Sequence, residues 1–261
     1  MPMIAIALYL VATALLWRAA AGGHAQARGW VPVAALALLF HAETHVEAWR
    51  LLQGPDMHFF AALSLVGIGM AALTTAYGAS GRMPALGIVV FPLATLALLG
   101  YVLYGHADAA SRLDWRLQLH AWLALLAYAT LALAAVLAIF LWAQERTLRR
   151  REFHAWLRAL PPLTELETLL FRSIAVGFVL LSATLLTGVL FVQNLLAQHL
   201  VHKTVLSVLS WLAFGALLLG RWRRGWRGAT AVRWTLAAMA LLVLAFFGSK
   251  FVLELVLRRP S

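Results

Sequence analysis

Apolar stretches long enough to cross a membrane recur along the whole chain. A hydrocarbon core about 30 Å thick needs roughly 20 apolar residues in a helix. The stretches that meet this need are Met3–Ala20, Trp30–Leu51, Phe59–Tyr77, Pro84–Tyr104, Leu117–Trp142, Thr168–Leu196, Thr204–Gly220 and Thr230–Leu257. The pattern predicts an all-α, polytopic membrane protein: one integral domain over residues 1–261, built as a bundle of about eight transmembrane helices.

The long polar connection between the fifth and sixth spans, residues 144–167, has a pattern of its own. Phe153, Trp156 and Leu160 follow helical spacing with arginines opposite, which predicts a short interfacial helix at about residues 145–160. Thr164 and Glu167 form a capping-box pattern that is expected to open the sixth span.

The amino-acid composition supports a membrane protein and excludes several kinds of binding site. Hydrophobic residues make up 63% of the chain and charged residues 12%, against about 25% charged in soluble domains. The net charge of +11 lies mainly in loops between apolar segments, so it indicates membrane topology and no nucleic-acid partner. The absence of cysteine excludes disulfides, thiolate metal sites and covalent haem attachment.

The distribution of basic residues predicts an orientation. With the N-terminus outside, most of the 21 lysines and arginines fall in cytoplasmic loops and flanks. Arg18 and Arg28 follow the first span and no basic residue precedes it, so we expect an uncleaved first helix.

Histidine is the informative residue type, with nine in so apolar a chain. His41 and His45 are four residues apart within the second span, so they share one helix face, and Glu43 and Glu47 lie on the other side. Ionisable groups at this depth are costly unless they are partnered, which makes them functional candidates. His58 is interpreted as an ordinary loop residue.

A second group of histidines is expected at the outer membrane face. His120 opens the fifth span with Tyr128 near the same face, while His199 and His202 lie where the sixth and seventh spans join. His120 can therefore approach His202.

Imidazoles that converge in an apolar bundle suit haem iron, here non-covalent, b-type haem. Lys203, Arg112 and Arg116 lie on the same side and could pair with its propionates. Zinc or another divalent cation is the competing ligand, and a proton relay or a purely structural network are further alternatives.

Several segments resemble the YpjD/HemX-like branch of the CcsA/CcmC cytochrome c assembly superfamily, a family of haem-handling membrane proteins. They are Leu119–Trp122 continuing to Leu126–Ala129, Leu160–Leu163, Glu167–Arg172, His199–Ser207, Gly220–Gly228 and Phe246–Phe251. The resemblance implies an eight-helix haem-handling fold in which His120 matches a haem-holding histidine and His41 matches a histidine of the second helix. The tryptophan-rich outer loop of the haem-exporting members is missing between the sixth and seventh spans, as is their second outer histidine.

These observations predict a multi-pass protein of a bacterial inner membrane that binds haem as a carrier or accessory and is not a complete haem lyase. The proposed iron ligands are His120 and His202, with His199 as alternate and His41 and His45 as a deeper position. Expected partners are the lipid bilayer and other cytochrome c maturation or membrane proteins, and no catalytic residues are indicated. The alternative is a non-haem membrane accessory or a divalent-cation transport partner.

Overall fold

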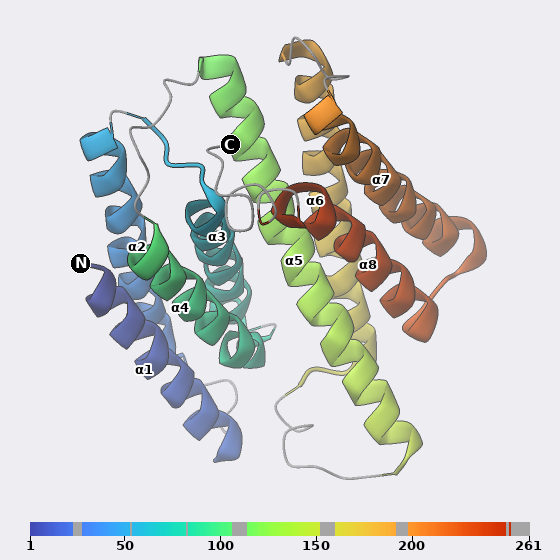
Figure 1. Cartoon of the computed structure of the whole chain (residues 1–261). Helices are drawn as coiled ribbons and strands as arrows, with labels where there is room; N and C mark the ends of the chain where they lie inside the picture. Colours follow the sequence, from blue (N-terminus) through green and yellow to red (C-terminus); the bar gives the residue numbers. More distant parts are fainter. Residues whose placement is uncertain are drawn as a thin grey trace. The chain divides into compact units, whose positions relative to one another are not determined.

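The computed structural model describes residues 1–22, 28–52, 54–81, 83–105, 114–151, 160–191, 198–248 and 251, with the side chains of 198–200 left aside (Figure 1). Throughout this described part the secondary structure is helical, without strands. The chain divides into two compact units, Met1–Arg112 with Thr147–Pro162, and Leu113–Arg146 with Leu163–Ser261. They are called the N-terminal and C-terminal units below.

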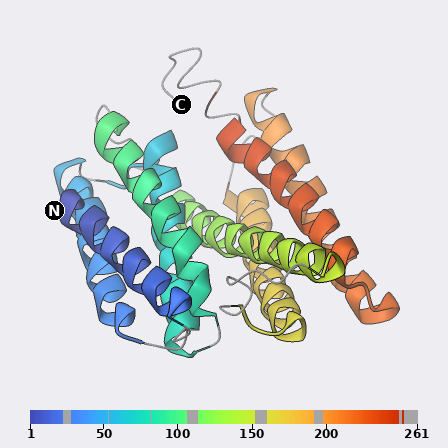
Figure 2. The same ribbon diagram turned by 90° about the horizontal axis from the view of Figure 1, so that it is seen from below.

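The N-terminal unit is built from α1 (Pro2–Ala21), α2 (Trp30–Leu52), α3 (Phe59–Ala79), a 3-10 turn (Pro84–Leu86) and α4 (Gly87–Tyr104). Helix α1 packs against both α2 and α4, and α4 packs on α3, as the blue and green ribbons of Figures 1 and 2 show. Glycine permits the close approach of α3 to α4, because a Cβ added at Gly67 would lie 3.2 Å from the Cβ of Ala97. Small residues at helix contacts are typical of membrane bundles.

The C-terminal unit is built from α5 (Trp115–Arg149, of which residues up to Arg146 belong here), α6 (Leu163–Phe191), α7 (Gln198–Arg224) and α8 (Gly228–Val243). A π-helical turn, Leu244–Gly248, extends α8. Helices α7 and α8 lie side by side and are joined by the short turn 225–227, the orange and red hairpin of Figure 1. Gly177 of α6 faces Leu131 of α5 so closely that a Cβ would clash.

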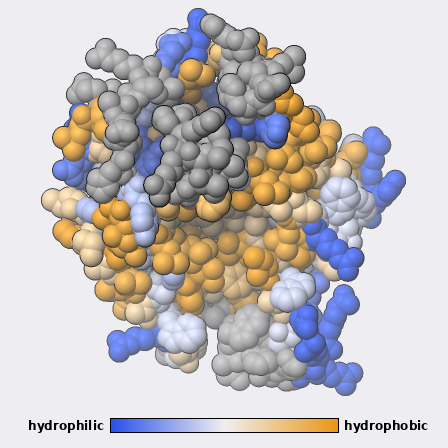
Figure 3. Space-filling model, viewed as in Figure 1, coloured by the Kyte–Doolittle hydropathy of each residue, from blue (hydrophilic) through white to orange (hydrophobic). Residues whose placement is uncertain are grey.

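The helices have the length and surface of membrane spans. Within the described residues, seven helices are long and apolar enough to cross a bilayer; α2, which carries Glu43, Glu47 and Arg50, is not one of them. Large apolar side chains such as Leu39 and Val189 are about two-thirds exposed, and hydrophobic residues cover much of the face seen in Figure 3. The prediction of an all-α polytopic membrane bundle is therefore confirmed. The outside N-terminus and the single domain stay predictions.

Of two local predictions, one is wrong and the other lies largely outside the described residues. The capping box is wrong: α6 already begins at Leu163, and Glu167 bonds to the start of α8. Of the predicted interfacial helix, residues 145–149 are the end of α5. Residues 152–159 lie outside the described part, as do His24, His106 and His154.

Candidate functional site

A group of polar side chains, called here the N-terminal polar cluster, lies inside the N-terminal unit. Its members are Tyr9, His41, His45, Asp56, His58, Ser64 and Tyr101. His41 is fully buried, with the Tyr9 hydroxyl 3.2 Å from its Nδ1 and the Ser64 hydroxyl 2.9 Å from its Nε2. The same Ser64 oxygen is 3.0 Å from Nε2 of His45. One hydroxyl of α3 therefore joins the two histidines of α2, and a tyrosine of α1 completes the group.

The bridging hydroxyl constrains the protons of both neutral imidazoles. A serine hydroxyl has one hydrogen, so Ser64 donates to one Nε2 and accepts from the other. If Tyr9 donates to His41 Nδ1, then His41 carries its proton on Nε2 and donates to Ser64, and Ser64 donates to His45. This arrangement gives each of these three contacts one donor and one acceptor, and it commits both nitrogens of His41 to protein partners.

The outer part of the cluster is an acid–imidazole pair in the connection before α3. Nδ1 of His58 is 2.7 Å from Oδ1 of Asp56, whose side chain is 4% exposed. Burial alone would raise the pKa of Asp56, but hydrogen bonds from His58 and Tyr101 and the charge of His58 together lower it below its usual value. The Tyr101 ring stacks on His45 at 4.7 Å and lies 6.1 Å from the His58 ring. His58 is thus a member of the cluster, which its interpretation as an ordinary loop residue missed.

His41 is closed to a ligand from outside the protein. His41 has no exposed surface and no uncommitted nitrogen. Glu43 and Glu47 are exposed on α2, on the side that the helical spacing predicted. Among the residues that the structure describes, no three His, Asp or Glu side chains come together in a way that could hold a metal ion.

The C-terminal unit contains a cavity of about 240 Å³ beside His120. The walls come from the beginning of α5, the end of α6, the beginning of α7 and the end of α8 with its π turn. Most of the lining is apolar, and His120, Tyr128 and Lys203 are its main polar members. A Cβ added at Gly188 would lie 3.2 Å from Cε1 of His120, so this glycine leaves room for the imidazole ring.

Thr187 is the hydrogen-bond partner of His120 in α6. Nδ1 of His120 is 3.1 Å from the Thr187 hydroxyl oxygen. That hydroxyl directs its single hydrogen back to the carbonyls of Ala183 and Thr184, at 2.9 and 3.0 Å. If its hydrogen stays with one of these carbonyls, the hydroxyl accepts from the imidazole, which places the His120 proton on Nδ1 and leaves Nε2 with a lone pair. An imidazole prepared in this way is suited to bind a metal centre.

Of the other predicted site residues, some line the His120 cavity and others do not. Lys203 lines the cavity, whereas His202, its neighbour in α7, is exposed and absent from the lining. Tyr128 lines the cavity too, but its hydroxyl donates to the Leu242 carbonyl. Arg116 is exposed at the start of α5, with its guanidinium 5.6 Å from the Trp115 ring. The His199 side chain lies outside the described part.

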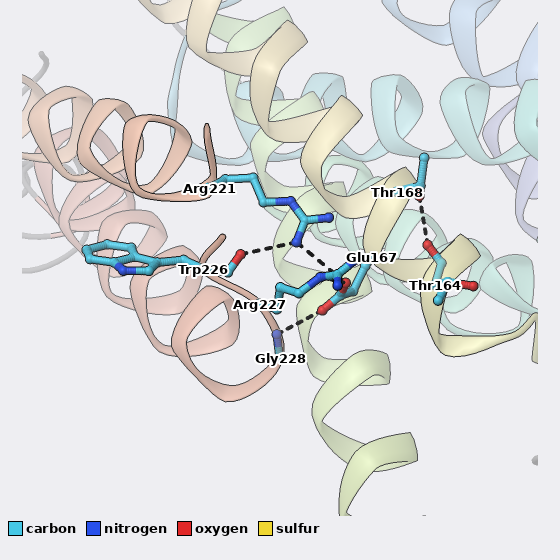
Figure 4. Close-up of polar contacts among 7 residues, drawn as sticks. All are labelled: Thr164, Glu167, Thr168, Arg221, Trp226, Arg227 and Gly228. Atoms are coloured by element: carbon cyan, nitrogen blue, oxygen red, sulfur yellow. Dashed lines mark hydrogen bonds and ion pairs between the residues drawn. The ribbon is translucent and has the colours of Figure 1, made fainter. Parts of the chain in front are cut away.

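A further buried carboxylate, Glu167, was predicted only as a helix cap. It accepts a hydrogen bond of 2.9 Å from the backbone N–H of Gly228 and forms ion pairs with Arg227 and Arg221 at 3.3 and 3.7 Å (Figure 4). It holds α6 to the turn between α7 and α8, at the end of the helices opposite the His120 cavity.

Comparison with known proteins defines the class to which this fold and site belong. Residues 30–257 match the family of cytochrome c assembly proteins, and the chain belongs to that family. Within it, the relatives place the chain in the YpjD/HemX-like branch of the CcsA/CcmC superfamily, as the sequence motifs predict.

Three relatives illustrate this placement. The chain is 36% identical over 137 residues to inner membrane protein YpjD of Escherichia coli (strain K12), covering 52% of each protein. It is 27% identical over 131 residues to protein HemX of Brevibacillus brevis, covering 49% of this chain and 48% of the relative. It is 32% identical over 90 residues to the cytochrome c biogenesis protein CcsA of Prochlorococcus marinus (strain MIT 9515), covering 34% of this chain and 29% of the relative.

The chain thus spans about half the length of YpjD and HemX, and less of CcsA. No solved structure matches it.

Proposed function

We propose that the chain is a haem-handling protein of a bacterial inner membrane, a carrier or accessory of cytochrome c assembly without complete haem lyase activity, in which His120 binds the haem iron. The proposal of haem as the ligand follows from membership of the cytochrome c assembly family. The proposal of the inner membrane as the location follows from the relative named inner membrane protein YpjD. The observation that carries the proposal is the His120–Thr187 hydrogen bond, which leaves an imidazole nitrogen free to bind iron within an apolar cavity.

The residues of the cavity fit a non-covalent haem. Its mainly apolar wall suits a porphyrin, and the chain has no cysteine for a thioether link. Lys203 is the cation of the lining and would pair with a propionate. When bound, haem would supply an iron centre that accepts an imidazole. The protein's own part is to keep the His120 proton on Nδ1 and to exclude water from the apolar wall.

The size of the cavity favours transfer over permanent retention. Sites that enclose a ligand of drug size usually measure about 300–1,000 Å³, more than the cavity of about 240 Å³ beside His120. A site of this size encloses only part of a porphyrin, as suits a protein that passes its ligand on. The second iron ligand predicted at His202 would have to come from an exposed position, so His120 is the ligand that the geometry favours.

The decisive experiment compares absorption spectra of protein purified from haem-replete cells. Wild type should show a Soret band, and His120→Ala should lose it or bind haem far more weakly. Thr187→Val should weaken binding about 10- to 100-fold, as loss of a hydrogen bond to a metal-binding histidine usually does, while the matched Thr187→Ser should bind normally. A colourless wild-type protein, or His120→Ala with full haem content, would refute the proposal.

A further inference from the structure

The turn between α7 and α8 has a fixed place with respect to the bilayer. Both flanking helices, Val201–Arg224 and the helix beginning at Gly228, are long and apolar enough to span a membrane. The residues between them are 225–227 alone. A connection this short between two spans must lie at one of the membrane–water boundaries.

This turn is held in one shape by several contacts. Gly225 and Gly228 have φ angles of 66° and 51°, in the left-handed region that glycine adopts most easily. Trp226 folds back against Gly220, where any Cβ would clash with the indole ring. Glu167 accepts a hydrogen bond from the backbone of Gly228 at the start of α8 and pairs with Arg227 of the turn and Arg221 at the end of α7 (Figure 4). The turn is therefore an ordered surface.

Positive charge exceeds negative charge at this surface. Glu167 already pairs with Arg221 and Arg227, and Glu145 is the other carboxylate next to Gly228. Three more arginines are exposed here without an ion pair to any described carboxylate, namely Arg223, Arg224 and Arg233. The excess positive charge makes this surface attractive to an anionic partner from outside the chain.

Tryptophans accompany these arginines. Trp222 is 79% exposed, and the Arg223 guanidinium lies 5.7 Å from its ring. Trp226 and Trp234 pack together at 5.5 Å. Exposed indoles are favoured at the level of lipid headgroups, where an apolar ring and a polar N–H both find suitable surroundings.

We propose that this turn binds the phosphate of an anionic phospholipid, with Arg223 and Arg224 as the headgroup ligands and Trp222 in the adjoining acyl boundary. Guanidinium groups bind phosphate oxygens through paired hydrogen bonds, and each basic residue near an anionic membrane surface adds to the attraction. Glu167 keeps Arg221 and Arg227 engaged within the protein and so holds the turn in position. The site lies at the opposite end of the helices from the His120 cavity and does not depend on haem binding.

The test measures lipid selectivity in vesicles of phosphatidylcholine that contain spin-labelled phosphatidylglycerol or spin-labelled phosphatidylcholine. We expect the wild-type protein to associate preferentially with phosphatidylglycerol. Arg223→Gln with Arg224→Gln should reduce this preference by about fivefold for each arginine removed. Arg18→Gln with Arg28→Gln removes the same number of charges at another helix connection and should reduce it less.

The comparison of the two double variants and a competition with inorganic phosphate distinguish a lipid site at this turn from the alternatives. Equal losses in the two double variants would mean that total charge, and not this turn, selects the lipid, and would overturn the proposal. Full selectivity in the Arg223/Arg224 variant would overturn it as well. Displacement of the labelled lipid by millimolar inorganic phosphate at constant ionic strength would identify a free anion as the ligand and refute a lipid site. Persistence of the lipid signal in phosphate supports it.

Discussion

His41 is buried and His120 is half-buried, and each imidazole is hydrogen-bonded to a hydroxyl group, yet their surroundings differ in one decisive way. Tyr9 and Ser64 occupy both nitrogens of His41. Thr187 occupies one nitrogen of His120, which lines a cavity. The number of nitrogens that the protein itself binds is therefore a better guide to a ligand site than the depth of a histidine in a helix.

The comparison also separates two uses of polar residues in an apolar protein. In the N-terminal polar cluster Tyr9, His41, His45 and Ser64 hydrogen-bond to one another across α1, α2 and α3, which offsets the cost of removing them from water. Asp56 Oδ2 and His58 Nε2, at the outer part of the cluster, are buried without a hydrogen-bond partner among the described residues. Beside His120 the polar groups are fewer and the wall is apolar. The first arrangement favours stability and a single packing of helices, whereas the second favours binding.

The largest expected effect comes from His41→Ala. This change removes a fully buried ring and leaves the Tyr9 and Ser64 hydroxyls with poorer partners, so it should cost about 3 kcal/mol or more of unfolding free energy. Unfolding in mixed detergent with increasing SDS measures that cost. The exposed His202→Ala serves as the control and should change the unfolding midpoint little.

Haem binding in the same variant sharpens the comparison. If the polar cluster is structural, His41→Ala protein that remains folded should keep its Soret band. Loss of the band at normal stability would instead make His41 a ligand, as the family resemblance implies, and would contradict the distinction drawn here.

A smaller effect is expected from Gly188→Ala. The added methyl group would lie 3.2 Å from the His120 ring, which must shift by a few tenths of an ångström. We expect haem affinity to fall several-fold with little loss of stability, measured by haem titration of the apoprotein. Gly100→Ala is the matched control: its Cβ would lie 3.1 Å from the Phe60 ring in the N-terminal unit, and haem affinity should stay unchanged.

The smallest effect concerns acid stability. The pKa of Asp56 is lowered in the folded protein, so its ionised form contributes stability that is present above the ordinary aspartate pKa of about 3.9 and is lost as pH falls further through the lowered folded pKa. Asp56→Asn should remove this contribution. Unfolding midpoints of wild type and variant should therefore differ above about pH 4 and converge as the pH falls further, and a difference that stays constant below about pH 4 would argue against the ion pair.

The helices themselves could be predicted from sequence because long apolar runs have few alternatives in a membrane. The histidine pairs could be predicted only in part. His41 and His45 share a helix face, as their spacing requires, but the sequence does not indicate that Ser64, from another helix, bridges them.

The prediction of both His202 and Lys203 as site residues shows which part of the site the sequence does not resolve. The seventh span was expected to begin at Thr204, which would leave the residues before it in a loop. Because α7 begins at Gln198, residues 202 and 203 are fixed about 100° apart around the helix axis, and it is Lys203 that lines the cavity. The prediction of Glu167 as a helix cap is wrong for a related reason. Its arginine partners lie more than 50 residues away in the chain, so no neighbouring residue in the sequence indicates them.

The short turn between α7 and α8 has a consequence for how the protein enters the bilayer. Moving arginines through the centre of a membrane costs about 2.5–3.5 kcal/mol each on insertion scales, so the turn with Arg221, Arg223, Arg224 and Arg227 should stay on the side where insertion starts. With the turn held there, the beginning of α7 and the end of α8 must cross to the far side. Those far ends carry Lys203 and Phe246, which line the His120 cavity. The lining of the His120 cavity is therefore complete only after both helices have crossed.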